Sequence, residues 1–434
     1  MAVSIDDVAH LLRRTGYACT AADTTAWTSG TLDALADHVL DNSTNPAVVA
    51  PAFLSDATLS DYERSQQLVV WWLNRMASVP SPLEEKMTFF WSGHFVVESG
   101  KVNSSLLLWN QHQLYRANAL GNFRTFTQAM AIDPAMLIYL DNRSNVKTSP
   151  NQNFARELQE LFTLGIGNYS EDDVIAAARA WTGYGVGVGP TYAYTYTDSR
   201  HDGAAKTIYG VTQAWTGPQM IDFLFDDPTK QLVMARYIAT KLWEFFAHPV
   251  PPAGVIDALA TIFISSAFEL KPLLKAMFLR PEFYLDAAKQ GLVRTPVDLS
   301  VAIRRLTGMT ADATTGTNDR GYLGGMGQWP YSPPNVAGWK ANSYWLSTSS
   351  VTSRLAYARN AANRLVTNHF PLNTTSLSVA DAVTRVLDVF GIINPSADLV
   401  GVLNRWLTDA RAKNWAAEAD LMALTMLSPE FQVA

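Results

Sequence analysis

Helix-start signals recur along the whole 434-residue chain and restrict the folds open to it. Ser60 and Glu63 have the spacing of a capping box, in which each side chain bonds the other residue's backbone amide. Ser81-Pro82-Leu83-Glu84 repeats that pattern, with proline at the first helical position. Asp133 precedes Pro134, and Ser170 precedes an acidic run that suits a first helical turn. These signals predict a mainly α protein.

Apolar residues recur at helical spacing after these starts. Ser149 and Pro150 are expected to start one such helix, over PNQNFARELQELFTL. Further periodic segments are 216–226, 229–247, 254–267, 269–279, 295–307, 348–367, 377–390, 396–412 and 414–427. We therefore expect a single large helical domain over residues 1–434.

Two segments interrupt the helical pattern. Residues 184–215 hold the only strand signals, an alternating run over 192–197 and a partner at 206–210, and we expect a small β-hairpin insertion there. Residues 310–347 are rich in Gly, Pro and Trp. Long irregular segments of this kind are usually functional loops or linkers. The aromatic residues between Trp329 and Trp345 favour an ordered loop.

Composition excludes several classes of function. The net charge is −6, and no run of Lys or Arg resembles a nucleic-acid footprint. No uninterrupted apolar segment is long enough for a membrane span. A single cysteine, Cys19, excludes an intramolecular disulfide and a cysteine-based zinc site. The first residues lack the apolar core of a signal peptide, so we expect a soluble, cytoplasmic chain, or an exported one if a leader was removed.

The 150–164 helix is the first candidate for chemistry. Asn153 and Glu157 are four residues apart and Glu160 follows three later, so all three can share a face. The ordinary interpretation is a solvated face on which Arg156 pairs with Glu160. The alternative is an inward polar row, in which burial of Glu157 raises its pKa for acid or base work. Upstream, Asp141 and Asn142 end an apolar helix, where they either cap it or join the same site.

Two histidines have suggestive settings. His94 lies in FFWSGHFVV, where a satisfied core histidine is the commoner outcome, and His201 precedes Asp202 in a polar loop. No tight metal signature and no other cofactor motif occurs. A mixed site from His94, His201, Asp141 and Glu157 nevertheless leaves a divalent metal open.

The order of motifs resembles a bacterial family labelled domain of unknown function 1800. The resemblance is carried by HLLRRTGY, FFWSGHF, YRANALGNFRTFTQAMAIDPAMLIYLDNRSN, NQNFARELQELFTLGIGNYSEDDVIAAARAWTGY, RHDGAAKTIYG, KLWEFF and PPNVAGWKANSYWLSTSS, and runs from about residue 8 to the C-terminus. It implies one long family domain without a known activity. The family pattern at FFWSGHF has two histidines, and Ser92 stands at the first, so His94 alone carries over. A two-histidine metal site at this motif is correspondingly weakened.

The resemblance implies a shared site among polar motif residues. The residues that carry over are His94, Asp141, Asn142, Asn153, Glu157, Glu160, His201, Asp202, Asn335 and Trp339. We interpret Glu157, Asp141 and His201 as catalytic, with Arg156 and Glu160 in support. His94, Asn142, Asn153, Asp202, Asn335 and Trp339 would bind substrate, the Asn residues through hydroxyls and Trp339 by stacking on a ring.

Three functions fit these residues. The leading one is a hydrolase-like enzyme whose carboxylates act on a small-molecule or glycan substrate. The second is a metal-dependent enzyme using His94, His201 and carboxylates. The third is a non-catalytic binding or assembly protein, in which the polar residues tie helices to loops and the protein partner is unknown.

Overall fold

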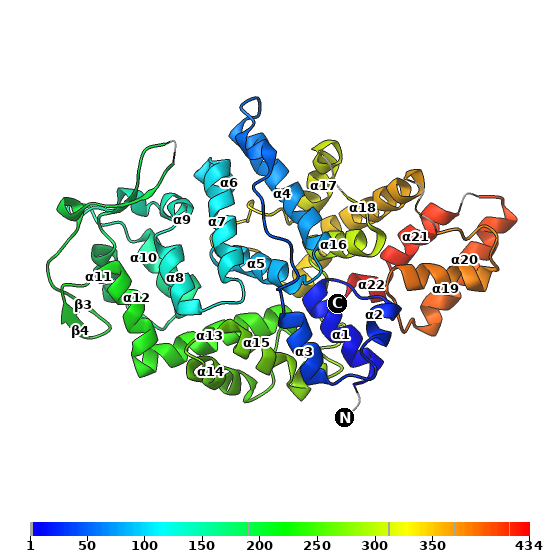
Figure 1. The fold of residues 1–434 in the computed structure, drawn as a ribbon, viewed down its shortest axis with the longest axis horizontal. Coiled ribbons are helices and arrows are strands. Elements are labelled where there is room, and N and C mark those ends of the chain that lie inside the picture. The colour runs from blue at the N-terminus through cyan, green and yellow to red at the C-terminus, as the bar shows by residue number, and fades with distance from the viewer. Residues whose placement is uncertain (1–2, 190, 311–312, 369, 371, 416) are drawn as a thin grey trace.

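The computed structural model describes residues 3–189, 191–310, 313–368, 370, 372–415 and 417–434. Residues 190, 311–312 and 416 fall within segments discussed above and lie outside the described residues. Helices run from one end of the molecule to the other, and the described strands are four short ones (Figure 1). The prediction of a mainly α domain is therefore confirmed.

The helices are named by chain order. Those before the strands are α1 (Ile5–Gly16), α2 (Ala21–Thr25), α3 (Leu32–Leu40), α4 (Asp61–Ser78), α5 (Leu83–His94), α6 (Ser99–Val102), α7 (Ser105–Asn118), α8 (Phe123–Ala131), α9 (Pro134–Tyr139), α10 (Asn153–Glu157) and α11 (Glu171–Ala180). Those after them are α12 (Gly217–Asp226), α13 (Pro228–Phe246), α14 (Val255–Ser265), α15 (Leu270–Phe278), α16 (Pro296–Thr307), α17 (Ala313–Gly325), α18 (Thr348–Thr367), α19 (Val379–Val389), α20 (Ala397–Ala412), α21 (Glu418–Met426) and α22 (Pro429–Gln432). Shorter helical turns are η1 (Ala52–Ser55), η2 (Asn142–Ser144), η3 (Leu158–Thr163), η4 (Asp198–Arg200), η5 (Pro281–Tyr284) and η6 (Asn342–Leu346).

Three of the predicted helix starts are confirmed. Ser60 and Ser170 form reciprocal capping boxes, and Asp133 accepts a hydrogen bond from the Met136 amide. The capping box at Ser81 is wrong, because α5 begins at Leu83 without a side-chain cap. The Glu84 carboxylate instead accepts hydrogen bonds from the side-chain amides of Asn42 and Asn45, at 2.5 and 3.0 Å, and so holds the preceding loop against α5.

The predicted start at Ser149 is also wrong. α10 begins at Asn153, and Ser149 closes a tight turn on Val146. Beyond Glu157 the backbone widens into η3, a π-helical turn in which the Leu164 amide donates to the Gln159 carbonyl. Wide turns of this kind interrupt α-helices rarely and often mark functional sites.

The 184–215 segment forms two hairpins, so the expected pairing of 192–197 with 206–210 is wrong. β1 (Tyr184–Val186) pairs antiparallel with β2 (Tyr194–Tyr196), and β3 (Lys206–Ile208) pairs with β4 (Val211–Gln213). Tyr209 and Gly210 join the second pair with φ of 50° and 80°. Positive φ at both central residues is the geometry of the tightest hairpin turn.

The expected loop over 310–347 is irregular only in part. Residues 313–325 form α17 in spite of their glycines, whose helix propensity is low. Tertiary contacts offset that cost. Asp319 of α17 is fully buried and accepts a hydrogen bond from Arg304 of α16, and the Leu323 side chain is buried as well. After α17 the chain runs without regular structure to η6, and Trp329 and Tyr331 lie in the core.

The molecule is elongated (Figure 1). The strands and α8–α12 lie at one end, α19–α21 lie at the other, and α4, α5, α7 and α16 stand between them. One hydrophobic cluster runs from Val8 to Phe431. Just before α16, Arg294 donates to the Tyr17 and Val433 carbonyls, and so joins the end of α1 to the C-terminal residues.

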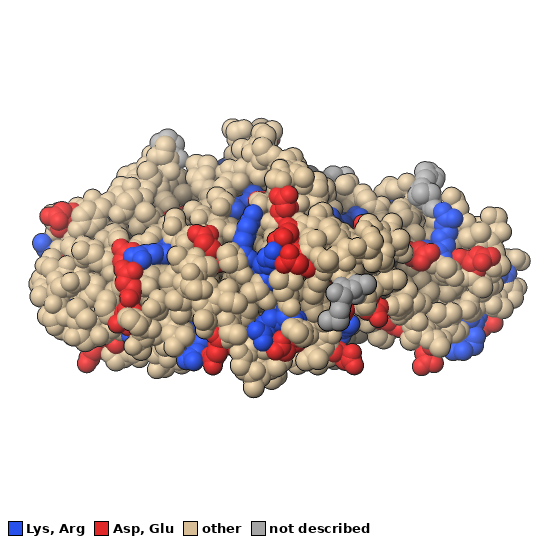
Figure 2. All heavy atoms as spheres, turned by 60° about the horizontal axis from the view of Figure 1, so that its bottom comes forward, with Lys and Arg blue, Asp and Glu red and all other residues tan. Residues whose placement is uncertain are grey.

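Basic and acidic side chains are interspersed on the face shown in Figure 2. Within the described ranges, no helix combines the length and the apolar character needed to cross a membrane.

Candidate functional site

A cavity of about 210 Å³ lies where three separate segments meet. The C-terminal half of α5, the C-terminal half of α13 and the segment 328–345 form most of its wall, and Thr295 at the start of α16 completes it. Its lining residues are Phe89, Phe90, Gly93, His94, Lys241, Glu244, Phe245, Thr295, Gln328, Ala337, Trp339, Lys340, Ala341 and Trp345. The segments that meet here include FFWSGHF, KLWEFF and PPNVAGWKANSYW, which lie far apart in sequence.

His94 lies at the C-terminal end of α5 and is buried. Its Nε2 atom is 3.0 Å from the Phe162 carbonyl, which can only accept, so Nε2 carries the proton. Nδ1 then holds a lone pair, and it is buried without a hydrogen-bond partner in the part of the chain that the structure describes. Burial, and next the charge of Lys241, hold the pKa of His94 well below its ordinary value. His94 is therefore neutral, and its side chain lines the cavity.

The acceptor of the His94 proton comes from the end of the π-helical turn. Gly165 ends this turn with φ of +81°, and the free carbonyls of its last residues point to neighbouring side chains. The Phe162 carbonyl accepts the hydrogen bond from His94 Nε2, and the Leu161 carbonyl accepts one from the Tyr237 hydroxyl at 2.9 Å. The NFARELQELFTLG motif thus orients the site through its backbone.

Lys241 and Glu244 lie three residues apart on α13 and share one face of it. In the described part of the chain Lys241 forms no ion pair, and its ammonium lies 5.4 Å from the centre of the Tyr237 ring. Burial lowers the pKa of Lys241 to about 8, and the nearby carboxylate of Glu244 opposes that shift. Glu244 is exposed to solvent, and partial desolvation of its carboxylate raises its pKa, against the effect of Lys241. Both pKa values therefore move toward neutrality.

Two indoles complete the wall opposite α13. The Nε1 atoms of Trp339 and Trp345 are buried, and no described residue forms a hydrogen bond with them. Trp339 stacks on Phe89, with 6.4 Å between ring centres. A Cβ on Gly338 would lie 2.6 Å from the Gly93 carbonyl, so this glycine permits the close approach of the 328–345 segment to α5.

These groups suit a small polar ligand. Buried polar groups are nearly always hydrogen-bonded, yet three side chains that line this cavity each carry a buried polar atom without a partner among the described residues. Two are donors and one is an acceptor, and the cavity also offers an amine, a carboxyl group and aromatic rings. An apolar cavity of about 150 Å³ accommodates benzene, so this larger space holds one six-membered ring with polar substituents.

Glu157, Asp141 and Asn153 lie elsewhere, on the surface formed by α6, α9 and α10. Asp141 forms an exposed ion pair with Lys101, 2.8 Å long, and Asn153 donates to the Leu140 carbonyl at 3.3 Å. Glu157 is half-buried, and within the described ranges it forms no hydrogen bond or ion pair through its side chain. Burial, and next the Glu160 charge, raise the pKa of Glu157 to about 6. The predicted shift of Glu157 is present, although Glu157 does not line the cavity beside His94.

The expected pairing of Arg156 with Glu160 is wrong. Arg156 donates two hydrogen bonds to Glu171, at 2.6 and 2.9 Å, which ties α10 to the start of α11. Glu160 accepts a hydrogen bond from the Tyr169 hydroxyl instead. The π-helical turn begins at Leu158, so Glu160 does not stand one α-helical turn beyond Arg156.

His201 and Asp202 fasten the hairpins to the end of α11. His201 Nδ1 lies 2.8 Å from the Thr182 carbonyl, and Asp202 accepts a 2.6 Å hydrogen bond from Arg179. Neither residue is joined to Asp141 or Glu157 by a hydrogen bond or ion pair in the described part of the chain.

The two remaining asparagines also bond locally. Asn142 is buried and donates to the Trp181 carbonyl at 3.2 Å. Asn335 is exposed, and its side chain accepts a hydrogen bond from the Ala337 amide at 2.9 Å. Its turn nevertheless immediately precedes Gly338 and Trp339, so Asn335 helps shape the cavity wall without lining it.

The structure does not bring His94, His201, Asp141 and Glu157 together as metal ligands. Among the described residues, no three His, Cys, Asp or Glu side chains are close enough together to share an ion. Of the predicted site residues, His94 and Trp339 line this cavity. Lys241, Glu244 and Trp345 were missed. The three-residue spacing of Lys241 and Glu244 on an otherwise apolar helix face was the available signal, and an unpaired indole leaves no signal in the sequence.

Comparisons with known proteins identify the family of this chain. No curated protein and no solved structure was found to match the chain. A family model described as a protein of unknown function (DUF1800) matches residues 10–433. That match spans the segments that enclose the cavity and nearly all of the chain. The chain therefore belongs to the DUF1800 family.

Proposed function

We propose that the chain is a hydrolase-like enzyme that binds a small, carbohydrate-type molecule in the cavity between α5, α13 and the segment 328–345. The observation that carries the proposal is the set of three unpaired buried polar atoms, on His94, Trp339 and Trp345, beside Lys241 and Glu244. Aromatic faces with polar groups at their edges suit a sugar ring, which presents apolar C–H faces and hydroxyl edges.

The proposed chemistry uses the two charged residues of α13. The Glu244 carboxylate takes a proton from the attacking water, while the Lys241 ammonium donates a proton to the leaving oxygen. A pKa of about 8 leaves most of Lys241 protonated at neutral pH and still makes it an effective acid. His94 Nδ1 accepts a hydrogen bond from a substrate hydroxyl, and the indole N–H groups donate to substrate oxygens.

Turnover of 4-nitrophenyl glycosides tests the chemistry. Glu244→Gln should reduce the rate roughly 100-fold or more, because general acid–base groups contribute on that scale. Glu157→Gln serves as the control, since Glu157 has a raised pKa but lies outside the cavity. Equal rates in wild type and Glu244→Gln would remove Glu244 from the reaction.

Binding is tested separately with two matched tryptophans. Trp345→Phe removes an unpaired N–H at the cavity, whereas Trp243→Phe removes an equally unpaired, fully buried N–H away from it. Both variants should show a similar change in Tm, because each loses the same atoms from the interior. Only Trp345→Phe should weaken monosaccharide binding measured by calorimetry, by roughly fivefold for one lost hydrogen bond. Equal affinities in the two variants would contradict the proposed site.

A second candidate centre uses Glu157 and Asp141, and one observation favours it. Glu157, at the end of α10, is half-buried with a pKa of about 6, which suits a general acid, and the Lys101–Asp141 ion pair joins α6 to the turn after α9. The same two variants decide between the centres. Loss of turnover in Glu157→Gln with retention in Glu244→Gln would move the chemistry to this surface.

A further inference from the structure

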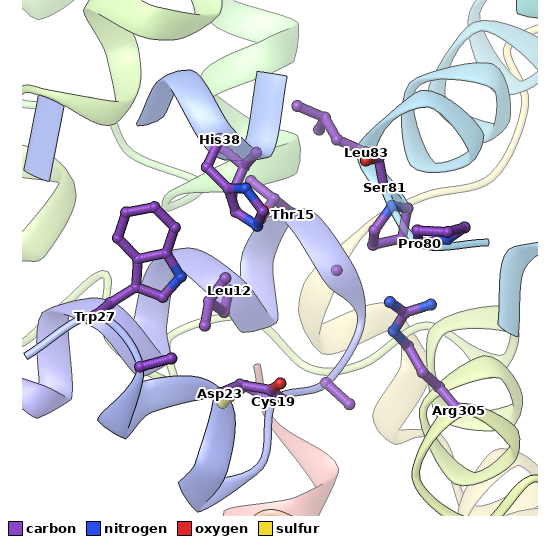
Figure 3. Close-up of a pocket in the computed structure, with 15 residues that line it drawn as sticks. Leu12, Thr15, Cys19, Asp23, Trp27, His38, Pro80, Ser81, Leu83 and Arg305 are labelled. Carbon is purple, nitrogen blue, oxygen red and sulfur yellow. The ribbon is translucent and has the colours of Figure 1, made fainter. Parts of the chain in front are cut away.

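A second cavity, of about 170 Å³, lies at the opposite end of α5 from His94. It is enclosed by α1, α2, α3, the turn at 80–83 that precedes α5, and the last turn of α16 (Figure 3). Its lining residues are Leu12, Thr15, Gly16, Ala18, Cys19, Asp23, Ala26, Trp27, His38, Val39, Pro80, Ser81, Pro82, Leu83 and Arg305. None of these residues belongs to the proposed catalytic site.

Arg305 is the cation of this cavity. Its Nη1 atom donates to the Ala77 and Val79 carbonyls, at 3.3 and 2.8 Å. Among the described residues Nε and Nη2 have no hydrogen-bond acceptor, and no carboxylate lies within ion-pair distance of the guanidinium. Figure 3 shows the guanidinium extending from α16 toward Pro80 and Ser81. A half-buried guanidinium with two free N–H directions is suited to a planar, bidentate anion.

The rest of the wall combines apolar and polar side chains. Trp27 packs against His38, with 4.9 Å between ring centres, and both flank the cavity in Figure 3. Leu12, Val39 and Leu83 provide aliphatic surface.

Asp23 limits the charge that the ligand can carry. One of its carboxylate oxygens accepts hydrogen bonds from both the backbone N–H and the hydroxyl of Thr20, each 2.8 Å long. This fixed negative charge on the same wall opposes a doubly charged ligand such as a phosphate monoester.

We infer that this cavity is a binding site for a small monocarboxylate with one apolar ring, whose carboxylate is bound by Arg305 and whose ring lies beside Trp27. The volume fits this assignment, because it slightly exceeds that of an apolar cavity that accommodates benzene. The site is separate from the proposed catalytic cavity, so it requires neither turnover nor the residues assigned to it.

The single cysteine provides a local reporter. Cys19 lines this cavity and is the only thiol in the chain. Its alkylation by iodoacetamide can be followed by mass spectrometry in wild-type protein, with benzoate, benzamide, benzylamine or phenyl phosphate present. We expect benzoate to slow alkylation and the other three to leave it nearly unchanged. Equal protection by benzamide would overturn the role of charge, and stronger protection by phenyl phosphate would overturn the choice of a carboxylate.

Calorimetric titration of benzoate gives an independent answer, including when Cys19 reacts too slowly to follow. Arg305→Lys should weaken binding roughly tenfold, since a lysine keeps the charge and loses the two-pronged geometry. Arg411→Lys is the matched control, because Arg411 also donates to two backbone carbonyls, those of Leu377 and Thr374, and lines neither cavity. Absence of benzoate binding in wild type, or equal affinity in Arg305→Lys, would overturn the inference.

Discussion

At the scale of single residues, unpaired buried atoms separate the candidate site from ordinary core. His94 could have been a core histidine with both ring nitrogens hydrogen-bonded. Nε2 is hydrogen-bonded, because it donates to the Phe162 carbonyl. Nδ1, in contrast, has no hydrogen-bond partner among the described residues. A site residue and a structural residue are here the same side chain, and only the environment of each nitrogen distinguishes the two roles.

Glu157 gives a test of pH dependence at this scale. Its folded-state pKa of about 6 lies above the ordinary value of 4.5, so the folded state holds the proton more tightly than the unfolded state. Stability should therefore fall as pH rises from about 4.5 to about 6 and stay constant above that. Glu157→Gln removes this effect and should stabilise the protein above pH 6, by less than about 1 kcal/mol because Glu157 is partly solvated.

Urea denaturation of both proteins at pH 4.5 and pH 7.5 measures this difference. The two should agree at the lower pH and separate at the higher one. A loss of several kcal/mol in Glu157→Gln at pH 7.5 would instead show that Glu157 supports the fold through a partner.

At the scale of elements, the turn between β3 and β4 has a backbone geometry that sequence periodicity does not predict. The β3–β4 turn at Tyr209-Gly210 needs positive φ at both positions, yet it lacks the Asn-Gly or Asp-Gly pair typical of such turns. The Tyr209 hydroxyl donates to the Gln159 side chain at 2.7 Å, and its backbone N–H donates to Asp173. Contacts to other elements therefore hold a residue that is unusual in this turn.

Gly210→Ala tests how much the positive φ of Gly210 contributes to the stability of that turn. An added Cβ would contact nothing within 4 Å, so the expected loss of about 1 kcal/mol comes from φ of +80° alone. Gly203→Ala is the control, because this nearby glycine also has open space but an ordinary φ, and the variant should be neutral or slightly more stable. Thermal unfolding of the two variants measures the difference, and equal Tm values would contradict the strained turn.

At the scale of the whole molecule, the candidate site exists because distant segments dock on one another. His94, Lys241 and Trp339 come from α5, α13 and the irregular segment beyond α17, and contacts among those segments close the cavity. Gly338 packs against the Gly93 carbonyl so tightly that an added Cβ would lie 2.6 Å from its oxygen, and the φ of Gly338 is +76°.

Gly338→Ala should separate the segment 328–345 from α5. A Cβ 2.6 Å from a backbone oxygen, added to a positive φ, should cost at least about 2 kcal/mol and abolish ligand binding at the cavity. Gly324→Ala, in α17 with open space around it, is the control and should be neutral or stabilising because alanine favours helix. Calorimetric unfolding and monosaccharide titration of both variants check the outcome, and normal stability in Gly338→Ala would show that the docking is loose.

The amino-acid sequence by itself determined the class of fold and most helix positions. Helix periodicity and caps such as those at Ser60, Asp133 and Ser170 act within a few residues, so they can be read from the chain alone. The motifs also carried the family resemblance, which the match over residues 10–433 confirms.

Tertiary structure decided the helical state of 313–325, the pairing of the strands, the partners of Arg156 and Glu160, and the meeting of His94 with Lys241, Glu244 and two indoles. Each of these depends on contacts between segments far apart in sequence, whose energies outweigh local propensity. A buried polar atom without a partner is likewise defined by what surrounds it, and that surrounding exists only once the chain has folded.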